Sequence, residues 1–576
     1  MKAFFRSFFA SFLAVVVVLM IIVAFIVGKS IQKPKIKDHS YLVVDIYGEV
    51  LEYHPPASVM GDIFGGQPEI LHRILNNLEK VCIDDRIDGV IVRLSSSNTA
   101  GHAMFQEIRG AIKKVRESGK KVYGFSDAIN RKTYYLAAAC DSIYMPPTAY
   151  INFLGFSTTT LHLKGALDKL GIKPNIHRIK DYKSAAEMII RKEMSPESRE
   201  NREWMLEEYW DTFVEALNED RGFSEENIVE IMDHALFTAA DAMEAGLIDR
   251  LLYWNDLEEM LKLEKDKRLR TVSQCRYAKV DPGKLGLKGK KKIAVVHAQG
   301  MIGGRQSKID PWFGVLMGHE SVAADLKRAR KDKDIAAVVF RVDSRGGEGL
   351  ASDLIGHEVE VVSGVKPIVA SMVDVAASGG YHISYRASKI VADPLTITGS
   401  IGSISGKFNM KGLYDKLGIT HDAATKGPKA LMFSDYRDFT EDEWKCFVDD
   451  HWAGFNAWLK DVAEHRGMTF EEAEKLAHGR VWSGKQAKEN GLVDELGGID
   501  RAIELAKELA GIPADEKVTV VHYPKKKGLL EMIFSGGGFT TATQWIIYHF
   551  IRDDLAETWR MLTEEPLYMI DEDIIE

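Results

Sequence analysis

A serine followed by two glycines stands between an apolar run and a helical pattern, in the sequence Ala-Ala-Ser378-Gly379-Gly-Tyr381. Residues 366–372 predict a short buried strand, and residues 381–387 predict a packed helix. A serine at such a corner presents its hydroxyl and the next backbone N–H near a helix N-terminus, as nucleophilic acyl chemistry requires. The alternative is an ordinary serine N-cap with glycines that ease the turn. The motif by itself leaves both interpretations open.

A second glycine pair, Gly346-Gly347, follows the predicted buried strand 337–342 and opens a helical segment. Glycines let backbone N–H groups approach a ligand, because no Cβ stands in the way. The Gly347 N–H could therefore complete a two-donor oxyanion hole with the Gly379 N–H. A tight strand-to-helix turn is the structural alternative.

The serine would also need a base. His382 lies four residues further along the same predicted helix, where contact with Ser378 is conceivable but a packing role is favoured. His297 and His357 stand in ordinary sequence contexts. A neutral lysine is the other option, because burial disfavours the ammonium and can lower a lysine pKa by up to about 3–5 units.

The size and composition of the chain indicate more than one domain and no nucleic-acid footprint. Its 576 residues are 45% hydrophobic and 28% charged, and the basic residues are dispersed in a chain of net charge −9. The four cysteines lie far apart, with no Cys-x-x-Cys and no histidine spacing suited to zinc. We therefore expect free thiols, no metal site and no nucleic-acid partner.

An apolar stretch near the N-terminus predicts a membrane anchor. It runs from residue 8 to residue 28, broken only by Ser11, and about 20 such residues span a bilayer core of about 30 Å. The stretch is longer than the ~7–15-residue core of a cleavable signal, and Phe25-Ile-Val27 is a poor cleavage site. An uncleaved anchor is therefore favoured over a removed signal. Its orientation is ambiguous, because lysines after the stretch outnumber the positive charges before it.

The rest of the chain contains an internal repeat, in which similar segments recur in the same order. The matching segments are 41–50 with 292–302, 86–95 with 334–343, 121–126 with 366–371, 237–241 with 482–486, and 246–249 with 491–494. A solenoid repeat would be much shorter, so the pattern indicates a duplicated domain. Strands alternate with helical segments, which predicts an α/β fold with a largely parallel sheet.

The duplication divides the chain into five predicted regions. They are a membrane anchor over 1–40, an N-terminal repeat over 41–264, a lysine-rich linker over 265–291, a C-terminal repeat over 292–524 and a tail over 525–576. The tail carries an apolar segment at 545–551 that is too short to span a bilayer. A membrane interface and packing on protein are both open to it.

The two repeats differ where chemistry would need particular residues. The second has Ser-Arg-Gly-Gly at 344–347, whereas the first has Ser-Ser-Asn at 96–98. At the place of Ser378 the first repeat has Lys132 or Thr133, depending on a one-residue gap. Residues with a purely structural role should be needed in both repeats, so this asymmetry favours a functional role in the second.

Three motifs of the second repeat, at 344–347, 371–381 and 398–402, resemble the signal peptide peptidase A family, the long two-repeat form of the S49 serine peptidases. The resemblance covers roughly residues 1–510. It implies tandem domains with the fold shared by Clp protease and the crotonases, and a Ser/Lys dyad that needs no metal or organic cofactor. It also implies a homotetramer in the bacterial inner membrane, with the catalytic bulk on the periplasmic side.

Carried over residue by residue, the resemblance implies a role for each site residue. Ser378 matches the nucleophile, and Lys183 matches the general base supplied by the degenerate first repeat. Ser400 matches the residue that orients the lysine amine. Gly347 and Gly379 match the oxyanion donors.

The residues around Lys183 do not by themselves identify it as a general base. It follows Asp181 at a predicted helix start, where the positive end of the dipole disfavours an ammonium. Glu187, one turn on, would favour the charged form in a solvated pair. Lys180 and Lys429 are competing candidates. The assignment of Lys183 therefore rests on the resemblance.

Two residues beside the site depart from the family pattern, namely Arg345 for proline and Val373 for a small residue, and they leave substrate preference open. We expect a membrane-anchored serine endopeptidase that degrades hydrophobic peptides such as released signal peptides. A crotonase-like acyl-CoA enzyme, which would share the fold and the paired oxyanion donors, and a non-catalytic membrane scaffold are the alternatives.

Overall fold

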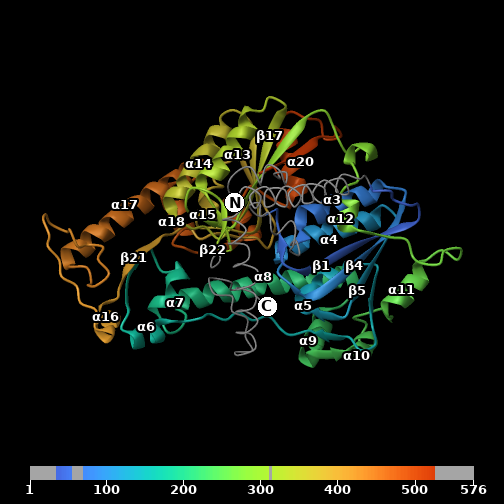
Figure 1. Ribbon diagram of the computed structural model, residues 1–576, viewed down its shortest axis with the longest axis horizontal. Coiled ribbons are helices and arrows are strands. Elements are labelled where there is room, and N and C mark those ends of the chain that lie inside the picture. The colour runs from blue at the N-terminus through green and yellow to red at the C-terminus, as the bar shows by residue number, and fades with distance from the viewer. Residues whose placement is uncertain (1–33, 55–68, 311–313, 526–576) are drawn as a thin grey trace, which may run out of the picture.

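The computed structural model describes residues 34–54, 69–310 and 314–525 (Figure 1). Two mainly parallel β-sheets form the centres of two successive repeats. The first sheet has the spatial order β11 (Arg250–Leu251), β7 (Ser142–Met145), β5 (Lys121–Ser126), β4 (Ile87–Asn98), β1 (Ser40–Gly48) and β12 (Thr271–Ser273). The α/β class and the parallel pairing are thereby confirmed for the first repeat.

The second sheet repeats this order with the corresponding strands β23 (Glu495–Leu496), β19 (Lys389–Ala392), β18 (Ile368–Ala377), β17 (Ile335–Ser344), β13 (Lys292–Gln299) and β24 (Thr519–Tyr523). It is extended by β20 (Ile397–Gly399), which also pairs with β18, and by β22 (Val481–Ser483), which pairs antiparallel with β20. The middle of β4, Val90-Ile-Val92, and most of β17, which is rich in Val and Ala, are buried, as strands covered on both faces must be. The duplication is therefore present in the fold as well as in the sequence.

Helices cover both sheets (Figure 1). In the first repeat they are α3 (Leu71–Ile83), α4 (His102–Glu117), α5 (Arg131–Ala137), α6 (Lys164–Leu170), α7 (Glu187–Ile190), α8 (Pro196–Arg221), α9 (Glu225–His234), α10 (Ala239–Glu244), α11 (Trp254–Leu261) and α12 (Gln274–Tyr277). In the second they are α13 (His319–Lys331), α14 (Gly349–Ser363), α15 (Gly379–His382), α16 (Lys411–Leu417), α17 (Glu441–Arg466), α18 (Phe470–Leu476), α19 (Gly484–Glu489) and α20 (Ile499–Leu509). Short 3₁₀ turns span Ser184–Ala186 and Pro282–Leu285.

Small sheets complete the structure. Three of them lie within one repeat each, namely β2 (Val50–Leu51) with β3 (Glu69–Ile70), β6 (Ala128–Asn130) with β8 (Tyr150–Asn152) and β10 (Leu236–Thr238), and β14 (Met301–Ile302) with β15 (Lys308–Asp310) and β16 (Gly314–Met317). The fourth joins the repeats, because β9 (Lys173–Arg178) of the first pairs antiparallel with β21 (Ile404–Asn409) of the second. Because β9 leads to Lys183 and β21 follows Ser400, this pairing holds the two segments side by side.

The longest helices of the two repeats, α8 and α17, show how the sequence sets their ends. Each has 26 residues. The Ser195 hydroxyl accepts the Ser198 N–H at the start of α8, and the Thr440 hydroxyl plays the same part for α17. Both helices end at a glycine in the left-handed region, with φ of 72° at Gly222 and 65° at Gly467. Equivalent end signals therefore produce equivalent helices in the two repeats.

A buried ion cluster joins the two repeats. Arg341 of β17 is fully buried, and its guanidinium donates to both Glu52 carboxylate oxygens at 3.0 and 3.2 Å. It also contacts Glu107 of α4 at 2.5 Å and donates to the Ser371 hydroxyl at 2.9 Å. Burial opposes ionisation of Glu52, but Arg341 and His297 outweigh it and hold the pKa of Glu52 at about 2. A charged carboxylate–arginine pair therefore fixes one repeat on the other.

Asp374 makes a second link between the repeats. It lies in β18, where the register with β17 shifts between Val342 and Ser344. Its carboxylate accepts the backbone N–H groups of Gly101, Ala103 and Met104 at 3.1, 2.8 and 3.2 Å, and so caps α4 of the first repeat. Because Asp374 is four residues from Ser378, this contact ties the position of the first repeat to the strand that carries the serine.

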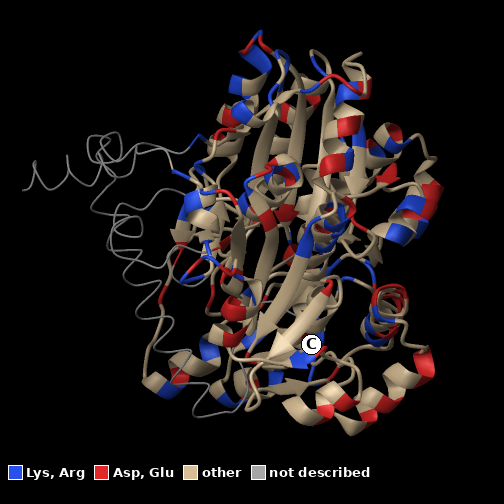
Figure 2. Cartoon of the chain, turned by 90° about the vertical axis from the view of Figure 1, so that its right-hand side faces the viewer, with Lys and Arg blue, Asp and Glu red and all other residues tan. Residues whose placement is uncertain are grey.

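Charged residues lie mainly over the outer helices and loops, while the strands are largely uncharged (Figure 2). All four cysteines are free, as the sequence predicts. The predicted linker 265–291 contains β12, which pairs with β1, and α12. The apolar stretch 8–28 and the tail segment 545–551 lie outside the described residues. Within the described ranges, no helix is long and apolar enough to cross a bilayer.

Candidate active site

Ser378 occupies a strained corner between β18 and α15. Its backbone φ is 55° and ψ is −117°, a left-handed conformation that is costly for a residue with a Cβ. The Ser378 N–H donates to the Gly399 carbonyl, and the Ser378 carbonyl accepts the His382 N–H, both at 2.9 Å. These two bonds hold the corner and leave the hydroxyl half-buried at the ends of the strands.

The glycine turn after β17 packs directly against this corner. Gly346 and Gly347 have φ of 98° and 147°, and a Cβ on Gly346 would lie 2.5 Å from the Gly379 nitrogen. The Ile302 N–H donates to the Gly346 carbonyl at 2.8 Å, and the Glu348 N–H donates to the Ile302 carbonyl at 2.9 Å. This ladder leaves the Gly347 N–H pointing away from Ile302. Only glycine fits both positions.

The two candidate oxyanion donors lie close together. A Cβ on Gly379 would lie 3.1 Å from the Gly347 nitrogen. Gly379 is the first residue of α15, where a backbone N–H has no acceptor within the helix. Two backbone donors beside a serine hydroxyl form the arrangement that stabilises a tetrahedral oxyanion.

Lys183 reaches this corner from the first repeat. Its Nζ lies 3.0 Å from the Ser378 hydroxyl oxygen, 2.9 Å from the Ser400 hydroxyl oxygen and 3.0 Å from the Ser400 carbonyl oxygen. The side chain is only 6% exposed. A neutral amine has two N–H donors and one lone pair, which match the two Ser400 acceptors and the Ser378 O–H. Glu187, the possible ion-pair partner one turn on, accepts a hydrogen bond from Arg178 at 2.9 Å.

A loop of the second repeat clamps the backbone of Lys183. Gly479 has a φ of 82°, and a Cβ there would lie 2.5 Å from the N, Cα and Cβ atoms of Lys183. The Gly479 N–H donates to the Ile401 carbonyl at 2.9 Å, and the Ser400 N–H donates to the Arg480 carbonyl at 2.7 Å. Gly479 is not predictable from the sequence, where its only signal is a glycine in the loop before a repeated motif.

Comparison with known proteins agrees with this arrangement. The model of Peptidase family S49 matches residues 114–268 and 360–513, once in each repeat. The chain belongs to peptidase family S49. The chloroplastic serine protease SPPA of Arabidopsis thaliana is 34% identical over 474 residues, which cover 81% of this chain and 70% of that protein. The Salmonella typhi protein named Protease 4 is 30% identical over 516 residues, which cover 85% of this chain and 81% of that protein.

A shorter relative matches part of the chain. The Enterococcus faecium protein named as a signal peptide peptidase SppA is 35% identical over 191 residues, which cover 33% of this chain and 56% of that protein. The chain is therefore a serine peptidase of family S49. Family membership favours this function over the acyl-CoA enzyme and the non-catalytic scaffold.

The rings of the candidate histidines His382 and His297 contact other residues. The His382 ring stacks on Trp458, with ring centroids 4.8 Å apart, and its Nε2 lies 3.6 Å from Asp353. His297 is buried, with its Nδ1 3.4 Å from Glu52 in the cluster between the repeats. The packing role predicted for His382 is thus confirmed.

The competing lysines Lys180 and Lys429 form ion pairs with glutamate and aspartate side chains. Lys180 pairs with Glu474 at 3.3 Å, and Lys429 pairs with Asp442 at 3.1 Å. Glu474 lies on α18 and Asp442 lies on α17. Lys183 is the one of the three whose Nζ contacts Ser378.

Two acidic side chains, Asp343 and Asp374, lie near the Ser378 corner. The Asp343 carboxylate accepts the Val375 N–H at 3.2 Å. Burial raises the pKa of Asp343 to about 7, with a further contribution from the nearby Asp374, while Arg345 opposes the rise.

Val373, which stands where the family pattern has a small residue, is fully buried against the core of the first repeat. This departure from the pattern therefore belongs to the contact between repeats.

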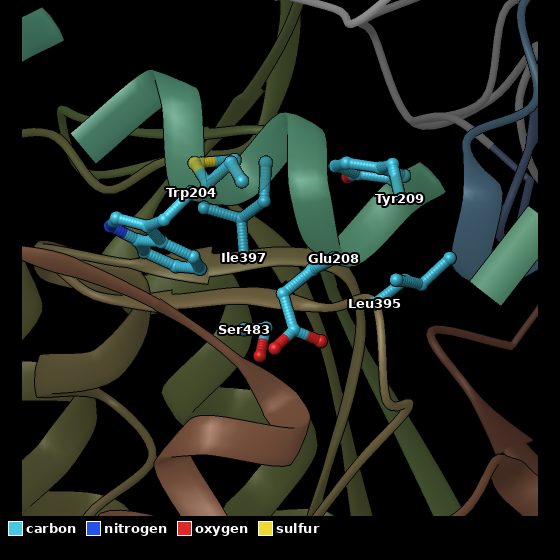
Figure 3. Close-up of a pocket in the computed structure, with 7 residues that line it drawn as sticks. Trp204, Glu208, Tyr209, Leu395, Ile397 and Ser483 are labelled. Carbon is cyan, nitrogen blue, oxygen red and sulfur yellow. The ribbon is translucent and has the colours of Figure 1, made fainter. Parts of the chain in front are cut away.

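A small cavity lies at the contact between repeats behind β20 (Figure 3). It is lined by Trp204, Met205, Glu208 and Tyr209 of α8 and by Leu395, Ile397 and Ser483 of the second repeat. Its volume of about 10 Å³ has room for one water molecule and no peptide.

Proposed function

We propose that this peptidase works through a Ser378/Lys183 dyad assembled across its two repeats. The observation that carries the proposal is the 3.0 Å separation of Lys183 Nζ and Ser378 Oγ. Neutral Lys183 takes the hydroxyl proton while the Ser378 oxygen attacks the carbonyl carbon of the scissile peptide bond. The Gly347 and Gly379 N–H groups hold the resulting oxyanion.

The second half of the cycle uses the same groups. Protonated Lys183 gives its proton to the leaving amine as the C–N bond breaks, which leaves an ester on Ser378. A water then loses a proton to Lys183 and attacks the ester carbon. Collapse of the second oxyanion releases the carboxylic acid and returns a proton to the Ser378 oxygen. Ser400 orients the amine throughout through its hydroxyl and its carbonyl.

The division of labour between repeats follows from this mechanism. The N-terminal repeat, over 41–264, supplies the base, and the C-terminal repeat, over 292–524, supplies the nucleophile and the oxyanion donors. A single repeat would therefore lack half of the dyad. The C-terminal repeat expressed alone should be inactive even when it is folded.

The substrates that we propose are hydrophobic peptides such as released signal peptides. Support comes from the name of the Enterococcus faecium relative and from the apolar stretch 8–28, which would hold the enzyme at the membrane where such peptides accumulate. We further propose a homotetramer in the bacterial inner membrane, with the catalytic bulk on the periplasmic side and no cofactor. Residues 525–576 would form its tail.

Hydrolysis of a hydrophobic peptide by the full chain and its variants tests the dyad. Ser378→Ala and Lys183→Ala should each lower kcat by about 10³-fold or more. Lys429→Ala is the matched control, because it removes a lysine from the corresponding segment of the other repeat, and it should keep full activity. Activity that survives in Lys183→Ala but disappears in Lys429→Ala would overturn the assignment of the base.

A further inference from the structure

Five basic side chains surround a cavity in the first repeat, where the described chain begins. The cavity volume is about 340 Å³, and its basic lining is Lys35, Lys37, Arg268, Arg270 and Arg276. We call it the basic cavity. Its walls come from the segment before β1, the segment that leads into β12, and α12. A concave site of this size lies within the range of pockets that hold small molecules.

The positive charge in the basic cavity is largely uncompensated. Arg270 pairs with Asp266 at 2.8 Å and donates to the Asp38 carbonyl at 2.8 Å. Among the described residues, the other four cations of the lining have no ion pair. Asp38 adds one exposed carboxylate nearby, so an excess of about three positive charges remains in a chain whose net charge is −9. Like charges that line one cavity repel one another, and a bound anion would relieve that repulsion.

The chemistry of the lining favours a phosphate. Arginine presents a planar fork of N–H donors that matches two phosphate oxygens, and lysine adds a mobile point charge. Leu269 and Val272 also line the cavity. Their apolar side chains suit the glycerol portion of a lipid better than a fully hydrated inorganic ion.

The position of the basic cavity along the chain indicates where the phosphate comes from. Lys35 follows the end of the apolar stretch, Gly28, by seven residues, so an extended chain would place it within roughly 25 Å of that point. If the stretch spans the bilayer, as proposed above, the cavity lies near the lipid headgroups. This placement rests on the proposed anchor, whereas the cavity and its charges do not.

We propose that the basic cavity binds the phosphate of an anionic phospholipid headgroup. Basic residues close to an anionic membrane surface each contribute to such attraction, and salt screens it. The site would hold the peptidase in a fixed orientation on the bilayer, in addition to any anchor. Inorganic phosphate shares the binding chemistry and is the competing source.

Thermal unfolding of the full chain in a neutral detergent tests the proposal. Short-chain phosphatidylglycerol should raise the unfolding midpoint saturably at low salt, and phosphatidylcholine of the same chain length should not. In Arg268→Gln/Arg276→Gln the apparent affinity for phosphatidylglycerol should fall roughly 30-fold. Lys284→Gln/Lys290→Gln removes two exposed charges that do not line the cavity, and it should respond like the wild type.

Three results would overturn the proposal. They are equal responses to phosphatidylglycerol and phosphatidylcholine, an unchanged response in Arg268→Gln/Arg276→Gln, and an equal response to inorganic phosphate, which would assign the site to free phosphate. If the first variant unfolds without lipid, Lys35→Gln/Lys37→Gln tests the same cavity from its other wall. The unfolding measurement does not depend on peptide hydrolysis, so failure of lipid binding and failure of the dyad can be told apart.

Discussion

Replacing Gly479 by alanine should displace Lys183, the proposed general base, without altering Ser378, the proposed nucleophile. The new Cβ would lie 2.5 Å from three atoms of Lys183, whereas carbon atoms in contact are separated by about 3.5–4.0 Å. The Lys183 backbone must therefore move by about 1 Å. A misplacement of that size in a reacting group costs about 10²-fold in rate. We expect kcat to fall by about 10²-fold with little change in KM.

Gly467→Ala is the matched control for the strain in this variant. Gly467 has a φ of 65°, and nothing lies within 4 Å of the Cβ that alanine would add. Both variants place alanine in the left-handed region, which costs about 1 kcal/mol of unfolding free energy. Gly479→Ala should lose more than this, because its Cβ also displaces Lys183. Only Gly479→Ala should show the fall in kcat.

The assay is steady-state hydrolysis of a hydrophobic peptide, with urea unfolding of each variant in parallel. The reasoning would be refuted by a Gly479→Ala enzyme with wild-type kcat. It would equally be refuted by a loss of kcat as large in Gly467→Ala, because strain alone would then explain the effect.

Two further predictions concern the buried charges. Arg341→Met leaves Glu52 and Glu107 buried without their cation and should cost roughly 3–5 kcal/mol in urea unfolding; a loss below 1 kcal/mol would show that the cluster does not hold the repeats together. Asp343 has a pKa raised to about 7 by burial and by Asp374, against about 3.9 in an unfolded chain. The folded state therefore binds the extra proton between about pH 4 and 7, and the contribution of Asp343 to stability falls as the pH rises through this window. Asp343→Asn should lose less thermal stability than the wild type between pH 5 and 8, and equal losses would contradict the assignment.

Local motifs made much of the second repeat predictable. Ser378, Gly379 and the pair Gly346-Gly347 stand in short segments whose conformation is set by neighbouring residues, and the structure places them around one point. The repeat of strand motifs likewise predicted two parallel sheets, because buried strands leave an unbroken apolar signal.

The contacts between repeats were not predictable from local signals. Lys183 is 195 residues from Ser378 in sequence, so only a resemblance could pair them. Nothing in the sequence indicated that Arg178 would bind Glu187 or that Lys183, just before a 3₁₀ turn, would reach the other repeat. Gly479 and Asp374 were missed for the same reason, since each acts on the opposite repeat.

The rate at which a serine-directed phosphonate modifies Ser378 tests the central claim most directly. In the wild type, neutral Lys183 should accept the hydroxyl proton, so the rate should rise with pH as the amine loses its own proton. Lys183→Met keeps the length and apolar stem of the side chain without the amine. It should react at least about 10²-fold more slowly, with that pH dependence gone. Modification of Lys183→Met at the wild-type rate, with the same dependence on pH, would contradict the account.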